Sequence, residues 1–153
     1  MYIALDLGDT TGWAVLNEEK IIRSGHSKVG NRKFPALRFP NFLKLLDDLK
    51  NMGGGKVKRI YYESVYMPHR SIAASYSYGG YKACLEIWGD KNVIPLCPVA
   101  CSSARMVVFG NGKIAKDEVL EKVKELYPTV SDHNQADAIT IGLWAIKMLG
   151  NQK

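Results

Sequence analysis

Residues 1–16, MYIALDLGDTTGWAVL, decide the fold. Residues 1–7 have the pattern of a buried strand, residues 8–12 that of a tight turn, and residues 13–16 that of a returning strand, so the stretch predicts a β-hairpin. The first strand ends on an acid, Asp6. A solvated carboxylate has no reason to follow a run of core residues, so this position indicates an acid that a rigid element holds for a function.

The remaining chain alternates strand and helix patterns. Further strands are predicted at residues 21–27, 56–63 and 92–99, and helices at about 41–50, 71–88, around Val119 to Leu126, and about 135–149. This order predicts one α/β domain, residues 1–153. Its five-stranded mixed sheet has an antiparallel three-strand meander followed by two parallel strands, flanked by helices.

Composition excludes several classes of protein. The chain has 153 residues, 46% hydrophobic and 24% charged, which is ordinary for a globular domain with its own core. No apolar run reaches membrane-spanning length, and the first residues lack the plan of a signal peptide. We therefore expect an intracellular, cytoplasmic protein without a membrane partner.

The three cysteines are Cys84, Cys97 and Cys101, an odd number without CxxC spacing. This argues against a disulfide framework and against a zinc site that needs four ligands.

The net charge of +6 favours a polyanionic partner, because neutralising phosphates releases condensed counterions. Charge alone is a weak signal, since many basic proteins bind no nucleic acid.

Three acids lie on separate segments: Asp6, Glu63 at the end of RIYYE, and Asp137 in the first turn of the last helix. Acids that end neighbouring parallel strands lie side by side, and the last helix can bring Asp137 to them. Two Mg²⁺ ions about 3.5–4 Å apart can hydrolyse a phosphodiester, and such ions need several carboxylate oxygens. These acids therefore predict a metal-dependent nuclease.

A fourth ligand is needed nearby, and the candidates are Asp132, His133 and Asn134. Bland alternatives stay open for each acid. Asp6 can cap a turn, Glu63 can form a surface ion pair, Asp137 can compensate the helix dipole, and Ser131 or Asp132 can be the N-cap of the last helix.

Four segments together resemble RuvC-type Holliday junction resolvases, particularly compact phage-like members. They are residues 1–12 (MYIALDLGDTTG), 62–67 (YESVYM), 110–119 (GNGKIAKDEV) and 134–139 (NQADAI). The resemblance implies a ribonuclease-H-like fold, a homodimer, paired Mg²⁺ or Mn²⁺ ions, and paired nicks on opposing strands of a four-way DNA junction. It also admits a phage-encoded protein that acts in a bacterial host.

The resemblance assigns roles residue by residue. Asp6, Glu63 and Asp137 become catalytic metal ligands, and Lys116 matches a lysine that faces the scissile phosphate. Arg105 falls where the family commonly has another lysine.

The resemblance also implies DNA contacts. Tyr66 matches an aromatic position used against unpaired bases. By their charge, Arg70, Arg105, Lys113, Lys116 and the basic segment at residues 28–38 are candidate phosphate contacts. The family's partner acid or histidine, three residues before the last aspartate, is here Asn134. Asn134 can ligate through its carbonyl oxygen, or the catalytic candidate Asp132 can reach in from the preceding turn.

The helix at residues 71–88 is a dimer element by the same resemblance, with its Gly79-Gly80 pair allowing close packing; packing within one subunit is the alternative.

Three rival functions remain. One is a broader branched-DNA or YqgF-like RNA nuclease, and another is a junction-binding protein that does not cleave. The third is a nucleotide-binding, actin-like ATPase domain, because residues 6–12 also resemble its first phosphate loop.

Overall fold

The computed structural model describes residues 1–31, 33–52, 54–65 and 71–151. Its centre is a five-stranded mixed sheet with the strand order β3-β2-β1-β4-β5. The first three strands pair antiparallel, and β1, β4 and β5 run parallel. The strands are β1 (Tyr2–Asp6), β2 (Thr10–Leu16), β3 (Ile21–Lys28), β4 (Arg59–Glu63) and β5 (Leu96–Val99). The predicted mixed sheet is therefore confirmed.

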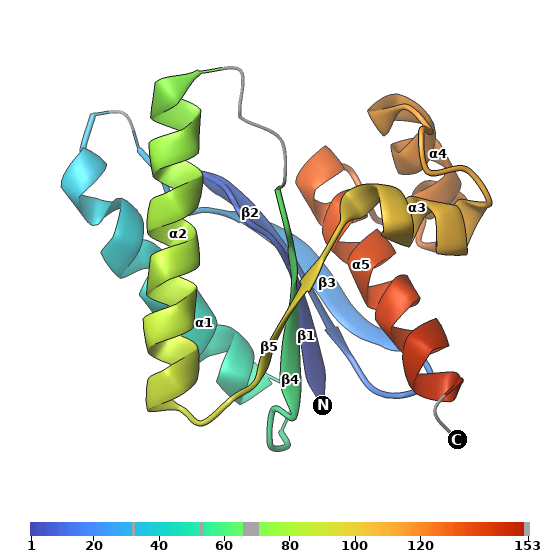
Figure 1. The fold of residues 1–153 in the computed structure, drawn as a ribbon, viewed down its shortest axis with the longest axis horizontal. Helices are drawn as coiled ribbons and strands as arrows, with labels where there is room; N and C mark the ends of the chain where they lie inside the picture. The colour runs from blue at the N-terminus through green and yellow to red at the C-terminus, as the bar shows by residue number, and fades with distance from the viewer. Residues whose placement is uncertain (32, 53, 66–70, 152–153) are drawn as a thin grey trace.

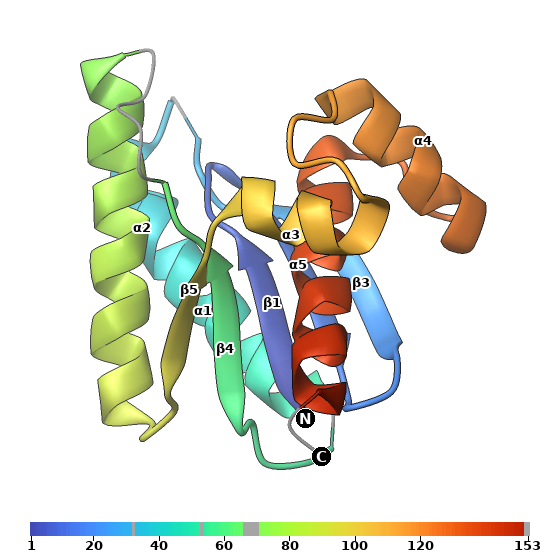
Figure 2. The same ribbon diagram turned by 45° about the vertical axis from the view of Figure 1, so that its right-hand side comes forward.

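Helices cover both faces of the sheet (Figures 1 and 2). A short 3-10 helix, η1 (Pro35–Leu37), leads into α1 (Arg38–Met52), and α1 and α2 (Ile72–Lys91) cover one face. The other face carries α3 (Cys101–Phe109), α4 (Lys116–Leu126) and α5 (His133–Gly150). Within the described residues, no helix is both long enough and apolar enough to cross a lipid bilayer.

The alternation of side chains along β1 decides where its acid points. Ile3 and Leu5 belong to the core beneath α1 and α2, whereas Ala4 belongs to the core beneath α5. Because successive side chains of a strand face opposite sides of the sheet, Asp6 shares the α5 side with Ala4.

Strand β4 follows the same rule. Tyr61 lies in the core on the α5 side, so Glu63, two residues later, faces α5 as well. Leu5 pairs with Tyr62 in the parallel register, and Asp6 and Glu63 each follow one residue later. The two acids therefore end adjacent strands on one face.

Helix α5 lies unusually close to the sheet because glycines leave room for it. Gly12 pairs with Asp6 across the hairpin, and a Cβ placed on Gly12 would lie 1.8 Å from the carbonyl oxygen of Asn134. Further along α5, a Cβ on Gly142 would lie 2.7 Å from Cδ1 of Ile21. The first contact sets the N-terminal end of α5 against the hairpin beside Asp6.

Several elements differ from the sequence-based expectation. The strand predicted at residues 56–63 begins only at Arg59, and the 3-10 helix η1 was not predicted. Helix α3 was not predicted, and its start at Ala100 has no side-chain cap. The fifth strand is shorter than residues 92–99, because Val93 has a left-handed backbone (φ 55°) and forms a turn with Asp90. Helix α1 begins at Arg38, before Pro40, because the first N–H groups of a helix have no intrahelical partner for a proline to remove.

Candidate metal-binding active site

Asp6 and Glu63 form a buried carboxyl pair at the ends of β1 and β4. Only 6% of the surface of Asp6 is exposed. Burial, a hydrogen bond with Glu63 and the negative charges of Glu63 and Asp137 raise the pKa of Asp6 well above its usual value. The two carboxyl groups thus share a proton in the absence of another cation.

Glu63 is the ionised member of this pair. Burial opposes ionisation, but hydrogen bonds from Asp6 and from the Cys101 thiol, with the positive charges of Lys116 and Arg105, hold the pKa of Glu63 below its usual value. The Cys101 Sγ lies 3.0 Å from Oε1 of Glu63. Burial and the neighbouring carboxylates raise the pKa of Cys101, so the thiol keeps its proton and acts as a donor.

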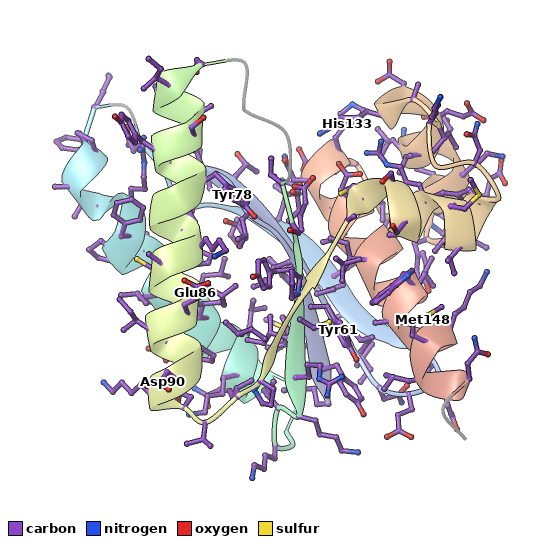
Figure 3. The ribbon with its side chains drawn as sticks, in the orientation of Figure 1. Tyr61, Tyr78, Glu86, Asp90, His133 and Met148 are labelled. Carbon is purple, nitrogen blue, oxygen red and sulfur yellow. The ribbon has the colours of Figure 1, made fainter. Side chains whose placement is uncertain are left out.

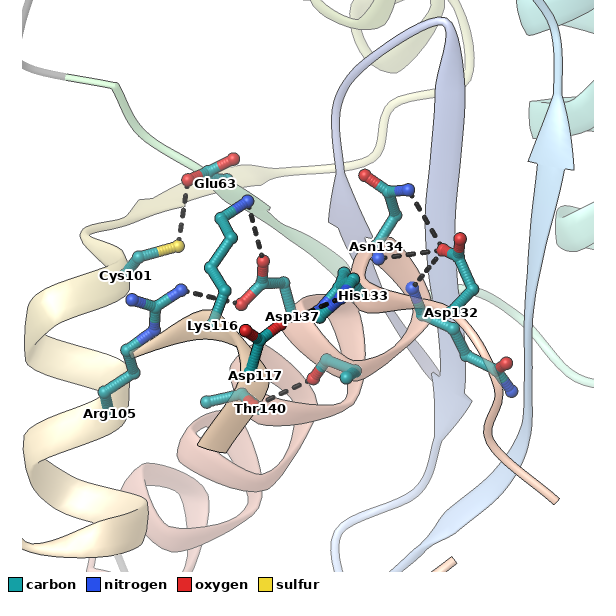
Figure 4. A network of polar contacts seen from close by, with 12 residues as sticks. Glu63, Cys101, Arg105, Lys116, Asp117, Asp132, His133, Asn134, Asp137 and Thr140 are labelled. Atoms are coloured by element: carbon teal, nitrogen blue, oxygen red, sulfur yellow. Dashed lines mark hydrogen bonds and ion pairs between the residues drawn. The ribbon is translucent and has the colours of Figure 1, made fainter. Parts of the chain in front are cut away.

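Asp137 projects from the first turns of α5 between two cations (Figure 4). Nη2 of Arg105, on α3, lies 2.9 Å from one carboxylate oxygen, and Nζ of Lys116, at the start of α4, lies 3.3 Å from the other. Asp137 and Arg105 are largely buried, with 5% and 14% of their side chains exposed, whereas the Lys116 side chain is 64% exposed. Lys116 is therefore the cation that incoming phosphate can reach.

The three candidates for a fourth ligand have other partners in the structure. Asp132 is the N-cap of α5, and its Oδ1 accepts hydrogen bonds from the backbone N–H groups of Asn134 and Gln135. The Asn134 amide also donates to Asp132, at 3.0 Å, and Nε2 of His133 lies 3.4 Å from Asp117 (Figure 4). These contacts are the ones expected if Asp132 is the N-cap of α5, the alternative considered from the sequence.

The oxygens of these acids suit one hard divalent cation, but they are not already arranged as a complete metal site. Among the described residues, no group of three or more His, Cys, Asp and Glu side chains is arranged so that it could hold a metal ion as it stands. Asp6 and Glu63 supply adjacent carboxylate oxygens, which Mg²⁺ and Mn²⁺ favour. Asp137 can add an oxygen if the exposed Lys116 side chain releases it.

Comparison with known proteins gives the fold a name. No protein-family model matches the chain, and no curated protein matches it. Thermus thermophilus RuvC in complex with Holliday junction substrate superposes with a TM-score of 0.78 over 98% of this chain and 95% of that chain, at 16% identity. This chain has a RuvC-like fold. A second structure of T. thermophilus RuvC gives a TM-score of 0.73 over 99% of this chain and 95% of that chain, at 14% identity.

Within the RuvC-like fold, the structure brings together most of the predicted catalytic residues. Asp6, Glu63, Asp137 and Lys116, and Arg105, which was predicted as a DNA contact, influence one another electrostatically at the carboxyl ends of β1 and β4. Their roles as ligands and catalysts stay predictions, as does the ligand role of Asp132 and Asn134.

The predicted DNA contacts are only partly described. Tyr66 and Arg70 lie outside the described residues. Lys113 is exposed in the loop between α3 and α4. Arg105 does not point outward as a surface phosphate contact would; its guanidinium is directed inward, to Asp137 and to the carbonyl oxygen of Ile114.

Besides the Cys101 thiol, sequence reasoning missed two groups that brace the site. The Tyr78 hydroxyl points from α2 toward the sheet (Figure 3) and donates to the carbonyl oxygen of Glu63 at 2.9 Å. In the hairpin turn after Asp6, Asp9 accepts a hydrogen bond from the Tyr81 hydroxyl at 2.8 Å and pairs with Arg38 at 3.1 Å. An Asp-x-Gly-Asp turn was a visible signal, but its partners on α1 and α2 were not.

Proposed function

We propose that this protein is a metal-dependent, structure-selective endodeoxyribonuclease that hydrolyses phosphodiesters at four-way DNA junctions by paired nicks. One observation carries the proposal: Asp6 and Glu63 end adjacent parallel strands opposite Asp137, in a chain that matches junction-bound RuvC over nearly its whole length. Buried acids that face one another have a high electrostatic cost, which a bound cation relieves.

The acids of the chain would create the hydrolytic centre. Asp6 and Glu63, held on rigid strands, would hold the cation in place of the proton that they share. Mg²⁺ or Mn²⁺, bound there, would neutralise the phosphoryl oxygens and activate the attacking water. The Cys101 thiol and the Tyr78 hydroxyl fix Glu63 through its side chain and its backbone.

Lys116 would meet the scissile phosphate. Its side chain is 64% exposed, with Nζ 3.3 Å from Asp137. Burial lowers the pKa of Lys116, but the charges of Asp137, Asp6 and Glu63 outweigh burial and raise it, so the side chain stays charged. A fixed positive charge near the phosphoryl oxygens stabilises the charge that develops during hydrolysis.

A homodimer would provide two such centres. Helix α2 exposes three large apolar side chains, Ile72, Tyr76 and Ile87, at 74%, 76% and 70%. Gly79 has nothing within 4 Å of an added Cβ, so this part of the helix leaves space for another backbone, whereas Gly80 already packs against Phe39 of the same chain. A twofold axis that relates two sites suits paired nicks in a junction with near-twofold symmetry.

Other functions make different predictions. A branched-DNA or YqgF-like RNA nuclease would use the same acids on forks, flaps or RNA hybrids. A junction-binding protein would bind without nicking, and an actin-like ATPase domain would bind ATP. The match to junction-bound RuvC is the reason to rank the four-way junction first.

The deciding experiment is a nicking assay on four-way junctions, Y-forks, flaps and RNA hybrids with Mg²⁺ or Mn²⁺. We expect symmetric nicks in the junction, lost in Asp6→Asn and retained in Asp48→Asn, which removes one exposed carboxylate from α1 on the opposite face of the sheet. Junction nicking that persists in Asp6→Asn would refute the proposed site. If the protein cleaved another substrate in preference to the four-way junction, the same active site would be assigned to that substrate.

A further inference from the structure

Both oxygens of the Asp137 carboxylate are already paired with cations of the protein. Arg105 contacts Oδ1 at 2.9 Å and Lys116 contacts Oδ2 at 3.3 Å. Asp6 and Glu63, in contrast, contact each other. The acids therefore divide into a carboxyl pair that needs a cation and a carboxylate that has its own.

Arg105 is fixed in this position. It projects from α3, next to the fully buried Ala104, and its Nη1 donates to the carbonyl oxygen of Ile114 at 3.3 Å while Nη2 donates to Asp137. The guanidinium is charged, because arginine keeps its proton in proteins. A planar guanidinium held at two nitrogens keeps a defined direction, which an exposed lysine does not.

Among the α5 residues that precede Asp137, none is an acid that could attract a second divalent cation. The residue three positions earlier on α5 is Asn134, a neutral amide that donates to Asp132. Asp132 is occupied with the cap of α5. A second divalent cation at Asp137 would also meet the positive charge of Arg105 at short range, and like charges in a buried site repel strongly.

We infer that each active site takes one resident divalent cation, on Asp6 and Glu63, and that the Arg105 guanidinium supplies the positive charge that a second cation would otherwise provide. This inference rests on the proposed nuclease function and specifies the number of its metal ions. It departs from the two-ion site that the sequence resemblance implies. Arg105, which faces Asp137 and not the surface, becomes a positioning residue that neutralises Asp137 in place of a second ion.

The first test counts metal ions by calorimetric titration of Mn²⁺ into the full chain. We expect one Mn²⁺ per protomer for the wild type. The double variant Arg105→Gln with Asn134→Asp removes the guanidinium and supplies the missing acid, and it should bind two. Lys44→Gln, which removes one exposed positive charge from α1 on the far face of the sheet, should still bind one.

The second test measures single-turnover nicking of a four-way junction against Mn²⁺ concentration. We expect a Hill exponent of about 1 for the wild type and about 2 for the double variant, as one-ion and two-ion sites require. Arg105→Gln alone should nick about 10²–10³-fold more slowly, the loss typical of one removed electrostatic donor, with junction affinity changed less than tenfold. Should Arg105→Gln fail to fold, Arg105→Lys should fold, bind one Mn²⁺ and retain part of the rate.

The outcomes separate the inference from the proposed function. Two Mn²⁺ ions per wild-type protomer, or a wild-type exponent of about 2, would overturn the single-ion inference and leave the nuclease intact. A double variant that still binds one ion would also overturn it. Absence of both Mn²⁺ binding and nicking in the wild type would remove the proposed function, and the inference with it.

Discussion

Replacing Gly12 by alanine is the most direct test of how the fold assembles its acids. Gly12 pairs with Asp6 in the hairpin, and the added Cβ would lie 1.8 Å from the carbonyl oxygen and 2.9 Å from the next backbone nitrogen of α5, at Gln135. These neighbours are backbone atoms, so no side chain can rotate away. The start of α5 would have to retreat by about 1 Å or more to reach a normal contact distance.

The cost should appear in both stability and rate. Overpacking typically costs about 1–3 kcal/mol, and we expect Gly12→Ala at or above the top of that range because the clash is with rigid backbone. A displacement of about 1 Å between catalytic groups can lower a rate by about 10²-fold, so nicking should fall by that factor. Urea denaturation and single-turnover nicking measure the two effects.

The matched control is Gly8→Ala in the same hairpin turn. Its added Cβ would lie 3.4 Å from the carbonyl oxygen of Thr10, an ordinary contact. We expect its unfolding free energy and nicking rate to stay close to those of the wild type. If Gly12→Ala proved as stable and active as Gly8→Ala, the close approach of α5 would not be what positions Asp137, and the reasoning would be refuted.

Three further predictions concern the cap, the turn and the charge. Asp132→Ala should cost about 1 kcal/mol of unfolding free energy, with Asp132→Asn nearly neutral. Burial opposes ionisation of Asp132, but hydrogen bonds from Asn134 and Gln135 lower its pKa. The stabilisation that the cap gives to α5 should therefore be complete above about pH 4 and decline as pH falls through the lowered pKa. Urea denaturation across this pH range measures it, and equal unfolding free energies for Asp132→Ala and the wild type would contradict the cap. Val93→Gly should raise the free energy of unfolding by about 0.5–1 kcal/mol, because an exposed β-branched residue occupies a left-handed conformation there. Thermal unfolding measures this change, and a lower stability would show that the valine side chain packs against other residues. Junction affinity should fall about 10³–10⁵-fold between 50 and 200 mM salt if 6–10 phosphates are contacted, and a flat response would remove the basic surface from the account.

Much of the fold could be predicted from local pattern. The apolar run before Asp6 and the run before Glu63 predicted strands, and the acids at their ends indicated a site, because strand alternation and parallel pairing are short-range rules. The RuvC-like fold was likewise recognisable from four short segments in order. These features depend on sequence neighbours, which a single sequence contains.

Helix α3 and the partners of the acids depend on long-range packing instead. Residues 101–109 begin with cysteine and two serines, have no side-chain cap and include two adjacent valines, so their helical propensity is weak. Without α3, neither the thiol of Cys101 beside Glu63 nor the inward direction of Arg105 could be foreseen. The cap role of Asp132 was foreseen as an alternative, because Asp before an apolar helix is a common N-cap.

The central position of β1 has a practical consequence for labelling. Met1 precedes β1 at the end of the sheet opposite Asp6, and α5 also ends at that end of the sheet in Figures 1 and 2. Affinity tags or fluorophores attached at either terminus should therefore stand clear of a bound junction.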